Sequence, residues 1–283
     1  MMNYQTILYE IRDKVAVLSL NRPDQLNAIN EVMLEEFYSA LEQAENDDSV
    51  TALILKGEGT DFSVGYDLRE ESVIDSGGDL GSAEGAKEMP QKQRRRQEIL
   101  LKLARFPKST IAQVQGRCLE MGCSLIMACD ISFAAEDAQF GEPSVRFGQT
   151  TDMPLWYYLV GVRKAKELLL TGKTIDGKEA ESIGLITKAV PSDLLESEVN
   201  EMALTVSLTP FDGLTNNREG FQTGIDARGL AAGWRMALDR RIFGIMRQTG
   251  RDAGGFDFKK VRSQKGWKAA LEEMNAPYER FGY

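Results

Sequence analysis

Proton transfer by this chain depends on carboxyl, phenol, amine or thiol groups, because its 283 residues include no histidine. The absence excludes a Ser-His-Asp triad, a Cys-His dyad and a zinc site with imidazole ligands. The sequence has no GxGxxG or Walker motif and gives no reason to expect a metal, a flavin or a nicotinamide cofactor. Aspartate and glutamate are therefore the first candidates for acid–base chemistry.

The three cysteines, Cys118, Cys123 and Cys129, fall within twelve residues and cannot pair evenly. Their apolar neighbours predict buried thiols in a reducing compartment. No signal peptide and no apolar run long enough to span a membrane is visible. We therefore expect a cytoplasmic protein without a membrane partner.

Acidic residues outnumber basic ones, 43 against 34, for a formal net charge of −9. This balance argues against a nucleic-acid partner. The one basic run, Arg94 to Arg96 with Lys92, predicts a solvated helix face, with a local phosphate site as the alternative.

Segments with strand and helix periodicity alternate, which predicts a mixed α/β core. Strands are expected in two runs between residues 5 and 20 and over 52–55, 110–114, 131–135 and 185–190. Helices are expected over 31–44, with Asn30 as N-cap, and over 91–104, 123–129, 155–160, 165–170 and 177–182. Residues 72–90 predict a mobile loop or a poorly ordered start of a helix. This segment either serves as a lid or is a tolerated surface insertion. The chain changes character after Pro210, so we predict a core over residues 1–205 and a helical region over 206–283.

Five segments in order make the sequence similar to the crotonase family, also called the enoyl-CoA hydratase/isomerase superfamily. They are Asn21 to Ala28, Asp61 to Leu68, Gln115 to Asp130, Ala138 to Pro143 and Lys164 to Leu185. The resemblance implies a spiral of ββα repeats with a C-terminal helical region that forms a homotrimer or a dimer of trimers. It also implies an acyl-CoA thioester substrate, with coenzyme A bound as part of that substrate.

Family members hold the thioester oxygen with two backbone N–H groups as it becomes an enolate. The resemblance assigns these donors to Tyr66 and Met121. Preorganised donors stabilise the enolate more than the ground-state carbonyl. The family often has a small residue in place of Tyr66 and glycines in place of Glu120-Met121-Gly122, so these side chains narrow the acyl space. Aromatic packing of Tyr66 and core packing of Met121 are the alternatives.

The two glutamates that position water in family hydratases correspond to Ser124 and Ser144. A serine without a neighbouring histidine is a poor general base. We therefore do not expect ordinary hydration by the usual pair.

Asp152 is the first candidate to replace those glutamates. Its position resembles that of the aspartate nucleophile in the family's 4-chlorobenzoyl-CoA dehalogenase and lies near the aspartate of naphthoyl-CoA-forming members. We expect it to act as acid–base group or nucleophile; the alternative is an N-cap ahead of Pro154. Glu120 and Glu142 are second candidates, with a surface or salt-bridge role as the default.

Trp156, Tyr157 and Tyr158 follow Asp152, and either stack on an aromatic acyl group or pack in the core. The resemblance places coenzyme A against seven residues, with the phosphates met by lysine or arginine of a neighbouring subunit. The seven are Asp24, Gln25, Leu26, Val64, Tyr66, Asp67 and Leu68.

Three functions remain open. The first is an acyl-CoA enzyme that stabilises an enolate during isomerisation, C–C or thioester hydrolysis, decarboxylation or dehalogenation. The second is a weak enoyl-CoA hydratase with relocated acid–base groups, and the third is a noncatalytic CoA-binding scaffold. An Asp152 that caps a helix and turns away from the pocket would favour the scaffold.

Overall fold

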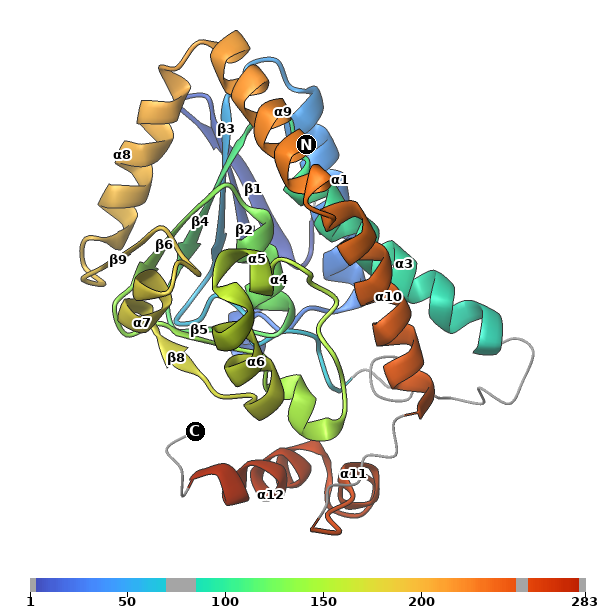
Figure 1. Ribbon diagram of the computed structural model, residues 1–283. Helices are drawn as coiled ribbons and strands as arrows, with labels where there is room; N and C mark the ends of the chain where they lie inside the picture. Colours follow the sequence, from blue (N-terminus) through green and yellow to red (C-terminus); the bar gives the residue numbers. More distant parts are fainter. Residues whose placement is uncertain (1–3, 70–84, 248–253, 280–283) are drawn as a thin grey trace.

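The computed structural model describes residues 4–69, 85–247 and 254–279, which form a mixed α/β fold of the predicted class (Figure 1). The larger sheet has the order β1-β2-β3-β4-β6-β9, and only its β1–β2 pair is antiparallel. Its strands are β1 (Ile7–Arg12), β2 (Val15–Leu20), β3 (Ala52–Gly57), β4 (Ser109–Val114), β6 (Ile131–Ala135) and β9 (Lys188–Val190). The smaller sheet contains β5 (Arg117–Leu119), β7 (Gln139–Gly141) and β8 (Ile175–Asp176).

Helices surround these sheets. The first ones along the chain are α1 (Glu31–Asn46), α3 (Gly85–Ala104), α4 (Met121–Ala128), α5 (Trp156–Leu159), α6 (Gly161–Thr171) and α7 (Gly177–Ser182). They are followed by α8 (Leu195–Ser207), α9 (Phe211–Ala227), α10 (Leu230–Arg247), α11 (Phe258–Lys265) and α12 (Trp267–Glu279). Two short 3-10 helices are η1 (Pro23–Gln25) and η2 (Pro143–Phe147).

The core lies around the larger sheet. Every residue of β2 is buried, as its continuous apolar run requires for a strand covered on both faces. Helix α8 packs against β2, β3, β4 and β6, whereas α3 contacts α1, α4 and α10. Figure 1 shows α9 and α10 following one another along the side of the molecule that carries α3. The C-terminal helices are thus packed on the core of their own chain.

The smaller sheet positions the chemistry. Strands β5 and β7 run parallel, with Leu119 opposite Gly141. The residues that follow them, Glu120 and Glu142, therefore leave the same edge of the sheet. The Glu120 N–H donates a 2.9 Å hydrogen bond to the Gly141 carbonyl, which holds the ends of the two strands together.

Three predictions of secondary structure need correction. Helix α3 begins at Gly85 instead of Gln91, and it contains Pro90. Proline removes one backbone hydrogen bond of the helix, and burial of the Met89 side chain in the added residues compensates for that loss. The strand expected over 185–190 is reduced to β9, since Leu185 and Ile186 are buried outside the sheet. Strands β5, β7 and β8 were not predicted, because each is only two or three residues long. The remaining part of the loop expected at 72–90, residues 72–84, lies outside the described residues.

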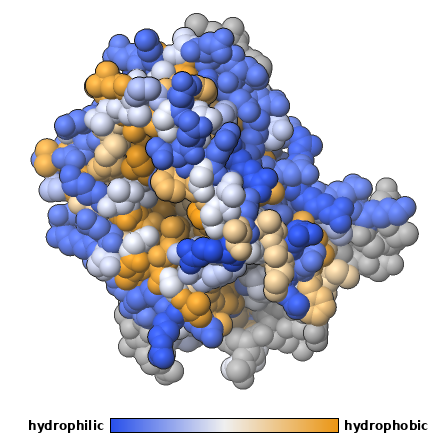
Figure 2. Space-filling model, turned by 45° about the horizontal axis from the view of Figure 1, so that its top comes forward, coloured by the Kyte–Doolittle hydropathy of each residue, from blue (hydrophilic) through white to orange (hydrophobic). Residues whose placement is uncertain are grey.

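Large apolar side chains are exposed on the outer helices. Figure 2 shows hydrophobic residues gathered in the middle of one face, with hydrophilic residues around them. Exposed examples are Val162 and Leu170 on α6, Leu204 on α8, Leu208, and Phe211 and Phe221 on α9. In the described parts of the chain, no helix is long and apolar enough to cross a membrane. The three cysteines are free thiols; Cys118 and Cys123 are buried and Cys129 is half-buried.

Candidate active site

Two backbone N–H groups point at one oxygen atom. The N–H groups of Tyr66 and Met121 both donate to Oε2 of Glu120, at 3.1 Å and 2.7 Å. These are the two donors that the resemblance assigned. Their convergence on one negatively charged oxygen is the geometry that an oxyanion requires.

The backbone N–H of Tyr66 does not donate to a carbonyl of the neighbouring strands, although the residues around it do pair with them. Ser63 pairs with β5, donating to the Arg117 carbonyl and accepting from the Leu119 N–H. Farther on, the Gly65 carbonyl accepts from Ile29 and the Asp67 N–H donates to Ile29. Because neighbouring N–H groups of an extended segment point in opposite directions, that of Tyr66 faces the site.

Met121 is the first residue of α4, so its N–H has no partner within the helix. Glu120 is the N-cap, with φ 52° and ψ −117°, a conformation that glycine adopts far more readily than glutamate. The turn also requires Gly65, because a Cβ there would lie 2.6 Å from Cβ of Glu120. The backbone is therefore strained where the carboxylate enters the site.

Arg241, from α10, is the counter-charge of Glu120. Its Nη2 and Nη1 lie 3.2 Å and 3.3 Å from Oε1 of Glu120, and Nη1 also donates to the Thr150 carbonyl at 2.7 Å. The arginine side chain is only 2% exposed. Burial raises the pKa of Glu120, and the Arg241 guanidinium opposes this rise. Burial alone would lower the pKa of Arg241, but Glu120 and Asp152 raise it, so the guanidinium keeps its charge.

Asp152 contacts the end of the Tyr66 side chain that is remote from the Tyr66 backbone N–H. Its Oδ2 accepts a 3.3 Å bond from the Tyr66 hydroxyl, and its Oδ1 accepts a 3.4 Å bond from the Ser124 hydroxyl. Burial and the Asp152 charge raise the pKa of Tyr66 well above its usual value, so the phenol stays a donor. Asp152 does not cap a helix: α5 has Leu155 at its N-cap, with no side-chain bond there. The capping alternative is thus wrong.

Glu142 forms a second buried acid group. The Ser144 hydroxyl is hydrogen-bonded to Oε1 of Glu142. Burial, followed by the charge of Glu120, raises the pKa of Glu142 to about 8. Ser144 and Ser124, which the resemblance assigns to the positions of the family's two glutamates, each contact a carboxyl group of another residue: Glu142 and Asp152.

The default expectation for Glu120 and Glu142 is a surface or salt-bridge role. The surface role is wrong, because both residues are buried. The salt-bridge role is confirmed for Glu120, which pairs with Arg241.

A cavity of about 510 Å³ leads to this cluster. All seven residues that the resemblance assigns to coenzyme A line it: Asp24, Gln25, Leu26, Val64, Tyr66, Asp67 and Leu68. Glu120 and Ser144 also line it, whereas Asp152, Met121, Ser124 and Arg241 do not. Tyr66 and Glu120 therefore contact both the cavity and the buried charges behind it.

The mouth of the cavity is built from charged side chains and the end of the chain. Asp67 pairs with Arg22 at 3.0 Å and with Arg69 at 2.6 Å, which gives its carboxylate a structural role. The end of the chain contributes Trp267, Leu271, Met274 and Asn275 of α12. Helix α12 is held there by a small apolar cluster in which Phe147 stacks on Phe258 at 5.3 Å.

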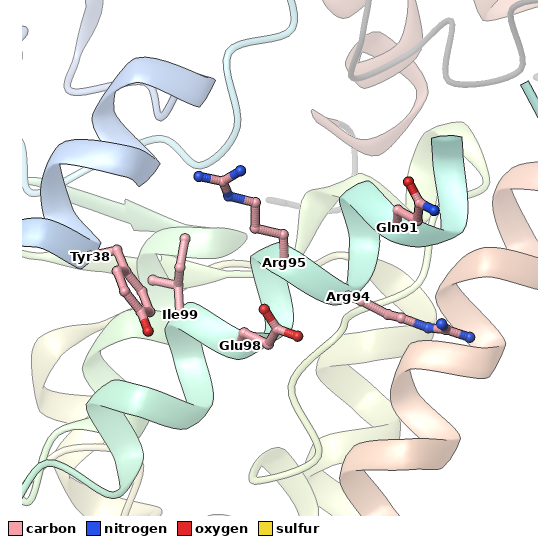
Figure 3. Close-up of a pocket in the computed structure, with 6 residues that line it drawn as sticks. All are labelled: Tyr38, Gln91, Arg94, Arg95, Glu98 and Ile99. Carbon is pink, nitrogen blue, oxygen red and sulfur yellow. The ribbon is translucent and has the colours of Figure 1, made fainter. Parts of the chain in front are cut away.

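A second cavity, of about 430 Å³, lies between α1 and α3 (Figure 3). Arg94 and Arg95 line it but extend from α3 in different directions, so they do not converge on an anion. Arg95 pairs instead with Glu35 at 3.3 Å. The prediction of a solvated basic face fails for Arg96, which is 2% exposed. Arg96 pairs with Glu31, and its guanidinium lies 4.5 Å from the centre of the Tyr66 ring.

The aromatic residues after Asp152 do not line the cavity of about 510 Å³. Trp156 is fully buried in the core, Tyr157 is partly exposed, and the Tyr158 hydroxyl donates to the Arg228 carbonyl at 3.0 Å. Of the two alternatives, packing describes Trp156 and Tyr158.

Arg241 and Arg96 are the site residues that sequence reasoning missed. Arg241 shares the buried stripe of α10 with Leu230, Trp234 and Ile245 at helical spacing. A charged residue within an apolar stripe needs a buried partner, and that pattern is the signal that could have identified it. Arg96 likewise lies on the buried face of α3, at helical spacing from the buried residues Leu100 and Leu103.

Comparison with known proteins agrees with this geometry. The model of the enoyl-CoA hydratase/isomerase family matches residues 10–249. A probable enoyl-CoA hydratase of Mycobacterium tuberculosis is 33% identical over 245 residues, which cover 86% of this chain and 90% of the relative. A short-chain-enoyl-CoA hydratase of Clostridium acetobutylicum is 36% identical over 203 residues, covering 69% and 73%. The crystal structure of an enoyl-CoA hydratase/isomerase from Xanthobacter autotrophicus Py2 superposes with a TM-score of 0.86 at 30% identity, over 97% of this chain and 99% of that one. The chain therefore belongs to the enoyl-CoA hydratase/isomerase family.

Proposed function

We propose that the chain is an acyl-CoA enzyme that stabilises a thioester enolate with the N–H groups of Tyr66 and Met121. The observation that carries the proposal is their shared bond to one carboxylate oxygen of Glu120. A carboxylate oxygen has the charge and hydrogen-bonding capacity of an enolate oxygen. One such donor contributes about 3 kcal/mol to the stabilisation of the transition state.

The thioester oxygen would replace Oε2 of Glu120 between the two donors. The acyl-CoA cavity ends at Glu120, so the carboxylate must turn aside before the oxygen can enter. A base then removes a proton from the carbon next to the thioester. The C–H electron pair forms a C=C bond, and the carbonyl electrons move to the oxygen held by the donors.

We assign Asp152 as the acid–base group of this step. Its position, one hydrogen bond from the Tyr66 hydroxyl, places a buried carboxyl beside the residue that supplies the first donor. Isomerisation, C–C cleavage and decarboxylation share the enolate, and its formation can be tested without knowledge of the final reaction.

The test is exchange of the acyl α-protons of butyryl-CoA for deuterium in D₂O, followed by NMR. We expect the protein to accelerate the exchange. The Asp152→Asn variant should lose the exchange while it binds the thioester within a few-fold of the parent. Tight binding without exchange would instead support a CoA-binding scaffold.

Hydration of a short enoyl-CoA is the second candidate, because relatives are named enoyl-CoA hydratases. One observation favours it: Glu142, with a pKa of about 8, is a proton donor at neutral pH and lies beside Ser144. Loss of the crotonyl-CoA thioester absorbance measures this reaction. Many turnovers per second would establish a hydratase with relocated groups; none, despite binding, would exclude hydration. The double variant Ser124→Glu with Ser144→Glu should raise the rate of crotonyl-CoA hydration above that of the parent.

We infer further that the chain works as a homotrimer or a dimer of trimers. The support is the exposure of several large apolar side chains near the start of α9 and along it, among them Leu208, Phe211 and Phe221, since monomeric proteins rarely expose large apolar patches. The partner of the site itself is an acyl-CoA thioester.

A further inference from the structure

Glu120 occupies its site with both oxygens. Oε2 accepts from the two backbone donors, and Oε1 faces the Arg241 guanidinium. The site therefore has two adjacent positions for an oxygen atom. One lies between the N–H groups of Tyr66 and Met121, and the other lies beside the buried guanidinium of Arg241. A substrate with a single oxygen would fill only the first.

Arg241 keeps hydrogen-bonding capacity for a ligand. Its Nε is buried and has no partner among the described residues. Its bonds to Glu120, at 3.2 Å and 3.3 Å, are longer than the 2.7–2.9 Å typical of charge-assisted pairs. A ligand oxygen placed on Arg241 could make shorter bonds than Glu120 does.

Displacement of Glu120 is favoured by its own conformation. Its backbone lies in a region that disfavours residues with a Cβ, which is a source of strain. Burial raises the pKa of Glu120 against the opposing effect of the Arg241 guanidinium, so the enclosed site disfavours the charged form of this carboxyl group. Its side chain already lines the cavity and needs no separate route out.

We propose that the natural acyl group carries a second oxygen on its β-carbon, as a β-oxo group or a β-carboxylate, which binds Arg241 in place of Glu120. This inference rests on the proposed function, since it places the thioester oxygen at the N–H groups of Tyr66 and Met121. The two oxygens of a folded 1,3-dicarbonyl group approach one another almost as closely as those of a carboxylate. The Glu120 carboxylate thus resembles in shape the part of the substrate that would replace it, and it has the negative charge of a β-carboxylate or of an enolised β-oxo group.

Arg241 then acts as a specificity-determining residue. A simple acyl chain that displaced Glu120 would leave Arg241 buried without an anion, and an unpaired buried charge is strongly unfavourable. A β-oxygen, as a carboxylate or as the enolate form of a β-oxo group, restores the anion. The site therefore discriminates against acyl groups that lack this oxygen, in addition to binding those that have it.

Calorimetry with malonyl-CoA, acetoacetyl-CoA and butyryl-CoA tests the inference. We expect malonyl-CoA or acetoacetyl-CoA to bind at least about tenfold more tightly than butyryl-CoA, as one charged hydrogen bond implies. The stronger of the two identifies the carboxylate or the oxo group. Acetoacetyl-CoA should also develop its near-ultraviolet enolate absorbance when bound. Equal binding of all three would overturn the inference and leave the proposed function standing, whereas failure of all three to bind would refute the proposed function.

Variants separate charge from folding. Arg241→Gln alone leaves Glu120 buried without a counter-charge, so the informative comparison is Glu120→Gln against Glu120→Gln with Arg241→Gln. The first should keep the preference for malonyl-CoA or acetoacetyl-CoA over butyryl-CoA, and the second should lose it. Arg240→Gln, at the exposed neighbouring position of α10, is the matched control. A preference that survives in the double variant would contradict the role of Arg241.

Discussion

Replacement of Glu142 by glutamine should make the stability of the protein less dependent on pH. The Glu142 side chain is 2% exposed, and its pKa is raised from 4.5 to about 8, chiefly by burial. Between these two values the folded state holds a proton that the unfolded state has released. The free energy of unfolding therefore falls as the pH rises from 4.5 to 8 and stays constant above that window.

The magnitude follows from the difference between the two pKa values. Each pH unit inside the window costs about 1.4 kcal/mol, so the full penalty is on the order of 5 kcal/mol, and roughly 3 kcal/mol applies at pH 7. Glutamine keeps the shape and the contact with Ser144 but cannot ionise. The stability of Glu142→Gln relative to the parent should therefore increase with pH by about 1.4 kcal/mol per unit across the window.

Urea unfolding of both proteins at about pH 5.5 and at about pH 7.5 measures this difference, which should change by roughly 3 kcal/mol. Glu219→Gln, at an exposed position of α9, is the control and should show no such change. A parent–variant difference that is the same at both pH values would refute the raised pKa, and with it the proton donor needed for hydration.

Two other changes, Glu120→Gly and Phe211→Asp, give three further tests of the site and the surface. Glu120→Gly should bind butyryl-CoA about tenfold more tightly, because it removes the carboxylate from the two N–H groups; calorimetry measures the affinity, and weaker binding would contradict the displacement. The same variant should unfold at a lower temperature, since Arg241 loses its partner; an unchanged or higher melting temperature would show that relief of strain outweighs that loss. Phe211→Asp should shift the chain toward the monomer in light scattering if the exposed apolar face is an interface, and an unchanged mass would exclude this residue from the contact.

The longer elements were predictable from local pattern. Both strands between residues 5 and 20, the Asn30 cap and the buried strand at β3 follow from periodicity and capping chemistry. The side-chain oxygen of Asn30 does accept from the Met33 N–H at 2.9 Å. The short strands of the smaller sheet lack such a pattern, because pairing at a distance, and not propensity, produces them.

The candidate site was predictable in its backbone and not in its charges. Resemblance identified the residues with N–H groups that converge, and the structure brings Tyr66 and Met121 to one oxygen. The carboxylate of Glu120 reaches that position only because the Glu120 backbone adopts a rare conformation, which no local sequence pattern predicts. Its partner, Arg241, lies 121 residues away, and only the packing of α10 against α3 brings it into the site.

The origin of Arg241 has a consequence for the order in which the protein assembles during synthesis. Residues 120, 142 and 152 emerge from the ribosome long before residue 241, and a domain generally folds as a unit. Until α10 docks, the nascent core would have to bury three carboxyl groups with no arginine from that helix. Ionised carboxylates resist burial, so the edge formed by β5 and β7 should stay hydrated until the last third of the chain arrives. Completion of the active site and completion of the fold would then be the same late event, and a fragment ending at residue 205 would lack both.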